Sequence, residues 1–164
     1  LDITVCCRSN DIIWGAYGAN AVHFSVLQEY MASRIGVAVG KYYQISNNFH
    51  SYVDVLDKKG MPNPFQPYIN QAFTPIKMVT TPENWDMDLE SFMSWTGSEE
   101  PDQEPQRYPD NPWFELTAEP FFVAHHFWKQ KLRAEAVEVL ENADGMSPDW
   151  RTAGLEWMRR RMAR

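Results

Sequence analysis

Cys7-Arg8-Ser9-Asn10-Asp11 closes the first stretch of the chain, in which apolar and polar side chains alternate from Ile3 onward. Alternation with a period of two predicts a half-buried β-strand, here over residues 1–9. Gly15 and Gly18 come next and indicate a loop with tight backbone turns. The opening of the chain is therefore predicted to be a strand that leads into a turn.

A helix and a second strand are expected after this turn. Residues 21–35 carry apolar side chains at helical spacing, and Gly36 is placed to end the helix. Lys41 to Val55 is rich in β-formers and predicts a long strand. One face of that strand is polar although the strand is expected to be central, so this face is predicted to line a cavity. Its members are Tyr42, Gln44, Ser46, Asn48, His50 and Tyr52.

The remainder of the chain is predicted to be mostly loop and helix. Residues 57–70 indicate turns, Ile76–Val79 a short strand, and the acidic, proline-rich residues 96–112 a mobile surface loop. One helix is expected from about Glu119 to Asn142. Another is expected from about Pro148 to Met162, with Ser147 as its N-cap.

Composition limits the classes of protein that the chain fits. Its 164 residues and 44% apolar content suit one domain with a sizeable core. A formal net charge of −7 argues against a general nucleic-acid binder. Cys6 and Cys7 are neighbours in a predicted strand and point to opposite faces, which disfavours a disulfide and suits a reducing cytoplasm. No spacing predicts a metal site and no apolar run predicts a membrane span.

Arg8, Ser9 and Asn20 are candidate ligand-binding residues. A guanidinium and a hydroxyl together suit a phosphate, although for Arg8 taken alone a surface ion pair at the end of a strand is the simpler explanation. The amide of Asn20 offers a donor and an acceptor, which match O4 and N3–H of uracil, whereas cytosine presents the opposite pattern. Asparagine is also a favoured helix N-cap, and for Asn20 taken alone capping is the simpler explanation.

His50 and Tyr52 are the third candidate element. They stand two residues apart in a predicted strand and therefore share a face, where they can converge on one hydroxyl group. A buried polar pair within the core is the alternative explanation for them. Each of these three elements alone is weak evidence for a binding site. Their occurrence together in this order along the chain is more specific evidence.

Taken in order, these residues resemble the thymidylate synthase and pyrimidine deoxynucleotide hydroxymethylase family. The resemblance rests on Arg8-Ser9-Asn10-Asp11, a glycine four residues later, an asparagine opening a helix, and His50-Ser51-Tyr52. It covers residues 1 to about 55. The turn before Asn20 and the strand before His50 depart from the usual family sequence in a way that resembles divergent, phage-type members.

The resemblance implies a role for each matching residue. Arg8 and Ser9 would hold the substrate phosphate, Asn20 would read the base, and His50 and Tyr52 would hold the 3′-hydroxyl of the deoxyribose. Asn10 and Asp11 would complete the substrate site. Asp11 would also act in catalysis and, with Gly15, contact the folate. The family's nucleophilic cysteine precedes the Arg-Ser run by roughly twenty positions, so Cys6 and Cys7 are interpreted as strand cysteines and the nucleophile is expected upstream of Leu1.

The resemblance also implies a fold and an activity. The fold would be α/β, a mixed and largely antiparallel sheet packed by helices, in one domain over residues 1–164 that forms a homodimer across the sheet. The activity would be transfer of a one-carbon unit from 5,10-methylenetetrahydrofolate to C5 of dUMP, giving dTMP. Hydroxymethylation of dUMP or dCMP with the same folate is the alternative. A nucleotide-binding homologue or fragment without catalysis is a third hypothesis.

Overall fold

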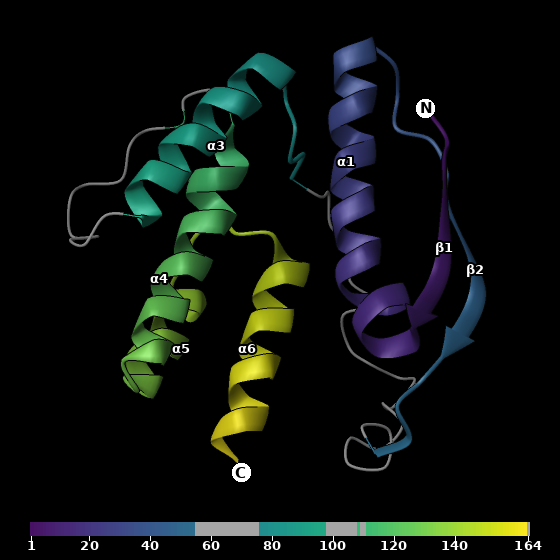
Figure 1. The fold of residues 1–164 in the computed structure, drawn as a ribbon. Helices are drawn as coiled ribbons and strands as arrows, with labels where there is room; N and C mark the ends of the chain where they lie inside the picture. The colour runs from purple at the N-terminus through teal and green to yellow at the C-terminus, as the bar shows by residue number, and fades with distance from the viewer. Residues whose placement is uncertain (55–75, 98–107, 109–110, 164) are drawn as a thin grey trace. The chain divides into compact units, whose positions relative to one another are not determined.

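The computed structural model describes residues 1–54, 76–97, 108 and 111–163. Contacts between residues divide the chain into two compact units, Leu1–Gln66 and Pro67–Arg164. The expected single domain stays a prediction, and each unit has its own internal packing (Figure 1).

The first unit is a strand–helix–strand arrangement. β1 (Ile3–Asp11) leads through η1 (Ile12–Ala19), a helical segment with wide turns, into α1 (Asn20–Ile35), and β2 (Tyr42–His50) follows. β1 pairs with β2 in parallel, from Ile3 opposite Tyr42 to Asp11 opposite His50. The predicted strand at residues 1–9 and the predicted helix at 21–35 are confirmed within one or two residues.

The predicted antiparallel arrangement is wrong for the two strands that the structure describes. Hydrophobic alternation identifies a strand but does not give the direction of its partner. Here α1 carries the chain back to the starting end of β1, so that β2 must run in the same direction as β1. The α/β class is confirmed, while a thymidylate synthase-like sheet is not seen in the described residues.

Helix α1 is attached to both strands by a buried polar side chain. Gln28 is 2% exposed, and its Nε2 donates to the carbonyl oxygens of Leu1 at 2.8 Å and of Lys41 at 3.1 Å. These bonds link the centre of the helix to the starts of the two strands. The helix ends as predicted at Gly36, whose φ of 77° is the left-handed conformation that glycine favours.

Strand β2 half-buries the first part of its polar face, while Asn48 on the same face is exposed. Tyr42, Gln44 and Ser46 are half-buried, whereas Tyr43 and Ile45 on the other face are exposed. The strand is shorter than the expected Lys41 to Val55, because regular pairing ends at His50. The residues predicted as turns at 57–70 lie outside the described part of the chain.

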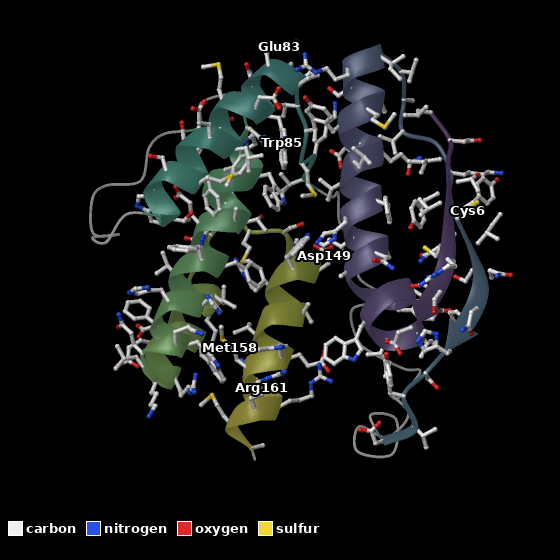
Figure 2. All side chains as sticks on the ribbon, viewed as in Figure 1. Cys6, Glu83, Trp85, Asp149, Met158 and Arg161 are labelled. Carbon is white, nitrogen blue, oxygen red and sulfur yellow. The ribbon has the colours of Figure 1, made fainter. Side chains whose placement is uncertain are left out.

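The second unit is helical in its described part. α3 (Pro82–Thr96) precedes η3 (Phe114–Ala118), which continues directly into α4 (Glu119–Lys129). α5 (Arg133–Glu141) and α6 (Pro148–Met162) complete the unit. A core of Ala124, Ala136, Leu140, Met146 and Met158 joins these last helices. Figure 2 shows Met158 on the side of α6 that faces α4 and α5.

Aromatic side chains join α3 to the start of the α4 segment. Trp85 of α3 lies with its ring centroid 5.0 Å from that of Phe114 (Figure 2), and Trp95 lies 5.1 Å from Phe122. Tyr108 and Asn111 are buried at 2% and 0% exposure, although both fall in the range predicted to be an acidic surface loop. Most of that range lies outside the described residues, so its mobility stays a prediction.

Two predictions for the second unit need correction. The helix expected from Glu119 to Asn142 is two helices, because Lys131 adopts a left-handed conformation with a φ of 67° between them. The described residues 76–79 form no strand, and α3 was not predicted. The helix from Pro148 to Met162 is confirmed with Ser147 at its N-cap position, where the serine hydroxyl donates to Asp149 at 2.8 Å and makes no bond to the backbone.

We expect Lys131→Gly to raise the free energy of unfolding by about 0.5–1 kcal/mol, because glycine adopts a positive φ without a steric penalty. Urea denaturation followed by circular dichroism measures this change. Lys129→Gly, two residues earlier in the last turn of α4, is the matched control and should be destabilising. Equal effects of the two substitutions would contradict the assignment of strain to Lys131.

Candidate functional site

Most of the predicted site residues gather at one edge of the two-stranded sheet. β1 and β2 are parallel, so their carboxyl ends meet at the same edge, and Asp11 stands opposite His50 there. α1 begins nearby with Asn20, after the short η1 segment (Figure 1). Ligands of parallel α/β units bind at this kind of edge. We call the group Ser9, Asn10, Asp11, Asn20 and His50 the strand-end cluster.

An amide pair forms the centre of the strand-end cluster. Asn20 donates from Nδ2 to Oδ1 of Asn10 at 3.0 Å, and Asn10 donates from its own Nδ2 to Oγ of Ser46 at 3.0 Å. Asn10 is 1% exposed. The oxygen and the nitrogen of its amide therefore both bond to protein side chains, and Asn10 connects Asn20 with Ser46.

Gly15 leaves the space that this amide pair needs. A Cβ atom at Gly15 would lie 2.1 Å from Oδ1 of Asn10 and 3.1 Å from Nδ2 of Asn20. The first distance is far inside van der Waals contact, so only glycine fits without displacing Asn10. The sequence predicts a folate contact for Gly15, which stays a prediction, and the structure gives a packing reason for the residue.

One carboxylate oxygen of Asp11 accepts hydrogen bonds from the backbone, and the other has no hydrogen-bond partner among the described residues. Its Oδ1 accepts hydrogen bonds from the backbone N–H groups of Ile13 at 3.0 Å and Trp14 at 2.6 Å, which caps the start of η1. Its Oδ2 is buried and has no partner among the described residues. A buried acceptor without a donor is costly in a folded protein. This oxygen is therefore available to a ligand that brings a donor.

The remaining predicted residues are only partly brought together. Oγ of Ser9 lies 3.4 Å from Nδ1 of His50, and the rings of His50 and Tyr52 meet edge to face with centroids 5.6 Å apart. Tyr52 is 54% exposed. Arg8 is exposed and has no hydrogen bond or ion pair with another described residue. Its proposed phosphate contact therefore depends on a ligand being present.

A hollow of about 390 Å³ is lined in part by Ser46, the hydrogen-bond partner of Asn10. Its lining comprises Ala16, Tyr17, Gln44, Ser46 and Phe49. Of the six residues on the strand face predicted to line a cavity, two, Gln44 and Ser46, line this hollow. Tyr17 and Phe49 were missed because an aromatic residue in a turn or strand carries no signal that separates lining from packing. The volume lies within the usual range for small-molecule sites.

The two cysteines stand outside this arrangement. Both are free thiols, and Cys6 lies on the side of β1 away from α1 (Figure 2). Cys7 is half-buried, with its Sγ 4.0 Å from Nε2 of Gln44. Within the described ranges no group of three or more potential metal ligands is found, and no helix is long and apolar enough to cross a membrane.

The second unit contains a buried acid that sequence reasoning missed. Glu119, at the start of α4, is 7% exposed. Burial raises the pKa of Glu119 to about 7; the neighbouring Tyr108 hydroxyl acts in the opposite direction, and the negative charge of Glu115 adds to the rise. The same carboxylate, after burial, helps to raise the pKa of Tyr108. Nothing in the spacing of these residues signals burial.

Comparison with known proteins gives a consistent result. A curated deoxyuridylate hydroxymethyltransferase of Pseudomonas phage M6 is 41% identical over 177 residues, covering 99% of the chain and 48% of that relative. A protein of the same name from Bacillus phage SP01 is 52% identical over 54 residues, which cover 33% of the chain and 14% of the relative. No protein-family profile and no solved structure matches the chain.

The chain is homologous to phage deoxyuridylate hydroxymethyltransferases. The similarity to the M6 relative extends along nearly the whole chain, which spans about half the length of that relative. The predicted resemblance to a phage-type thymidylate synthase-like family is thereby confirmed. The relatives carry the name of the alternative activity, whereas thymidylate synthesis itself gains no specific support.

We expect Gly15→Ala to lower the free energy of unfolding by roughly 1–3 kcal/mol, the usual cost of overpacking. The new methyl group would meet the Asn10 amide, whose Oδ1 lies 2.1 Å from the Cβ position. Denaturant unfolding of Gly15→Ala, Asn10→Ala and the double variant measures the coupling between the two positions. Gly15→Ala should cost less once Asn10 is alanine. The same cost in both backgrounds would contradict this explanation of the glycine.

Proposed function

We propose that the chain forms the pyrimidine-nucleotide site of a deoxyuridylate hydroxymethyltransferase, which adds a one-carbon unit to C5 of dUMP. The observation that carries the proposal is the 41% identity over 99% of the chain with a relative of that name. The strand-end cluster supports it, because an amide, a hydroxyl, a carboxylate and an imidazole meet at the ligand-binding edge of a parallel unit.

In this proposal different side chains at and near the strand ends contact different parts of the nucleotide. Oδ1 of Asn20 accepts N3–H of uracil, and its remaining N–H donates to O4. His50 and Tyr52 bind the deoxyribose 3′-hydroxyl, while Arg8 and Ser9 bind the phosphate. Arg8 suits this role because its guanidinium is exposed and unpaired within the described chain.

A folate-type one-carbon donor fits one observation in the site. The buried Oδ2 of Asp11 has no hydrogen-bond partner in the described structure and can accept one from an N–H group of such a donor. The donor, 5,10-methylenetetrahydrofolate in this proposal, supplies the methylene carbon. Addition of water to that carbon would complete a hydroxymethyl group. The chain's own contribution is to hold the pyrimidine with C5 accessible.

The nature of the product tests this function. The complete gene product is incubated with dUMP and 5,10-methylenetetrahydrofolate, and the nucleotide is analysed by mass spectrometry. A hydroxymethylated nucleotide is the expected result, and dTMP would mean thymidylate synthesis. Binding of dUMP without any product would favour a non-catalytic nucleotide-binding homologue.

A variant of His50 tests the nucleotide site itself. His50→Ala should weaken dUMP binding by roughly 1–3 kcal/mol, the scale of a lost polar contact. Isothermal titration calorimetry measures the affinity. His23→Ala, on an exposed position of α1, is the matched control and should bind dUMP as the unsubstituted protein does. Unchanged affinity in His50→Ala would remove the residue from the site.

The exposed face of the sheet supports a homodimer as the functional form. Parallel strands are normally covered on both faces. α1 covers one face here, whereas Tyr43 and Ile45 on the other are 46% and 57% exposed. Ile45 stands opposite Cys6, so the exposed surface continues across both strands. A second copy of the chain, packed on the same surface, covers it in this proposal.

Ile45→Lys should shift the protein toward monomer, because it places a charge at the centre of this contact. Sedimentation velocity measures the distribution of monomer and dimer. Val53→Lys is the control, since Val53 is 68% exposed and lies beyond the end of β2. A monomeric unsubstituted protein, or an Ile45→Lys variant that remains dimeric, would contradict the proposed interface.

A further inference from the structure

We propose that the second unit binds a small aromatic anion in the groove between α4 and α6. Aromatic side chains line this α4–α6 groove, and arginine side chains stack on two of them. All of its lining residues belong to the second unit. The proposed nucleotide site uses none of them, so the inference goes beyond the proposed function.

The α4–α6 groove forms where one face of each helix meets the other. Its volume is about 320 Å³, which lies within the usual range for small-molecule sites. On each helix the lining residues recur at spacings of three and four, and such residues share one helix face. Among them are Phe121, His125 and Trp128 of α4, and Trp150, Ala153 and Trp157 of α6.

Small residues of α6 give the groove its floor and its free space. A Cβ atom at Gly154 would lie 2.8 Å from Cε1 of Phe121, so glycine is what allows the two helices to approach here. Trp150 and Trp157 stand seven residues apart, which is roughly 10 Å along the helix axis. Ala153 lies between them and bears only an exposed methyl group. The indoles therefore flank a space that a planar ring can enter.

Two arginines bring positive charge to the walls of the groove. The guanidinium carbon of Arg133 lies 3.8 Å from the ring centroid of Trp128, whose carbonyl oxygen accepts a hydrogen bond from the same guanidinium. The guanidinium carbon of Arg161 lies 3.9 Å from the ring centroid of Trp157. An indole face that already carries a guanidinium is not available to a cationic ligand. The groove therefore favours an anion.

Arg161 is the arginine best placed to bind this anion. It extends from the end of α6 (Figure 2), in a last turn that contains three consecutive arginines. Arg159 forms an ion pair with Glu141, and Arg160 forms one with Glu156. Arg161 is exposed and has no hydrogen bond or ion pair with a residue in the described ranges. Its guanidinium N–H groups can therefore bind a carboxylate or a sulfonate.

Three naphthalene derivatives that differ in charge test the proposal. Naphthalene-2-sulfonate, naphthalene-2-methanol and (2-naphthyl)trimethylammonium are titrated into the complete gene product, and isothermal titration calorimetry measures their affinities. The sulfonate should bind most tightly. The formal net charge of −7 acts in the opposite direction, because unspecific attraction would favour the cation. Equal affinities, a preference for the cation or no binding of the sulfonate would overturn the proposal.

A substitution that fills the groove locates the binding. Ala153→Leu places a larger side chain between the indoles and should weaken binding of the sulfonate by about tenfold, because overpacking the occupied groove is unfavourable. Ala134→Leu, at an exposed position of α5, is the matched control and should leave the affinity unchanged. An Ala153→Leu variant that folds and binds the sulfonate as before would overturn the proposal.

A substitution of Arg161 tests the charge contact. Arg161→Gln should weaken binding of the sulfonate by about fivefold, the scale of one exposed charge contact, and leave binding of naphthalene-2-methanol unchanged. Arg160→Gln removes the same charge from the same helix end and should have no effect, because Arg160 pairs with Glu156. Equal effects of the two substitutions would overturn the proposal. Both alter exposed side chains, so this comparison remains decisive if Ala153→Leu fails to fold.

Discussion

The parallel pairing of β1 with β2 is the constraint on which the candidate site depends. Asp11 and His50 end their strands opposite each other only because the strands run in the same direction. An antiparallel pair of the same strands would place these residues at opposite edges of the sheet. The long return through α1 enforces the direction, and Gln28 fixes that helix to the start of both strands. The direction of the two strands therefore decides which residues can meet at the site.

Local sequence signals identified most of the elements near this site. Alternation revealed β1 and β2, helical spacing revealed α1, and Gly36 marked its end. The direction of pairing could not be predicted, since it depends on the path of the chain between strands. In the second unit, the chain between α4 and α5 bears no glycine or proline, so the break at Lys131 gave no sequence signal.

The sequence predicted which residues gather at the candidate site, but it did not predict which protein contacts each of them makes. Taken alone, Asn20 was more simply explained as a helix cap, yet its side chain bonds to Asn10 and not to the helix backbone. Asp11 was assigned to catalysis, and one of its oxygens caps η1. The role of Gly15 became clear only when the position of the Asn10 amide was known. These are contacts between residues whose side chains meet only in the folded chain.

The buried carboxylic acid of the second unit has a consequence for proton balance. Glu119 has a pKa of about 7 in the folded chain, against an ordinary value of 4.5. Between these pH values the folded chain therefore holds a proton that the unfolded chain releases, and folding is accompanied by proton uptake. The contribution of this proton to stability is complete below pH 4.5 and is lost as the pH rises toward 7. The free energy of unfolding of the helical unit should therefore be lower near neutral pH than at pH 4.5, because burial of the ionised Glu119 carboxylate is unfavourable.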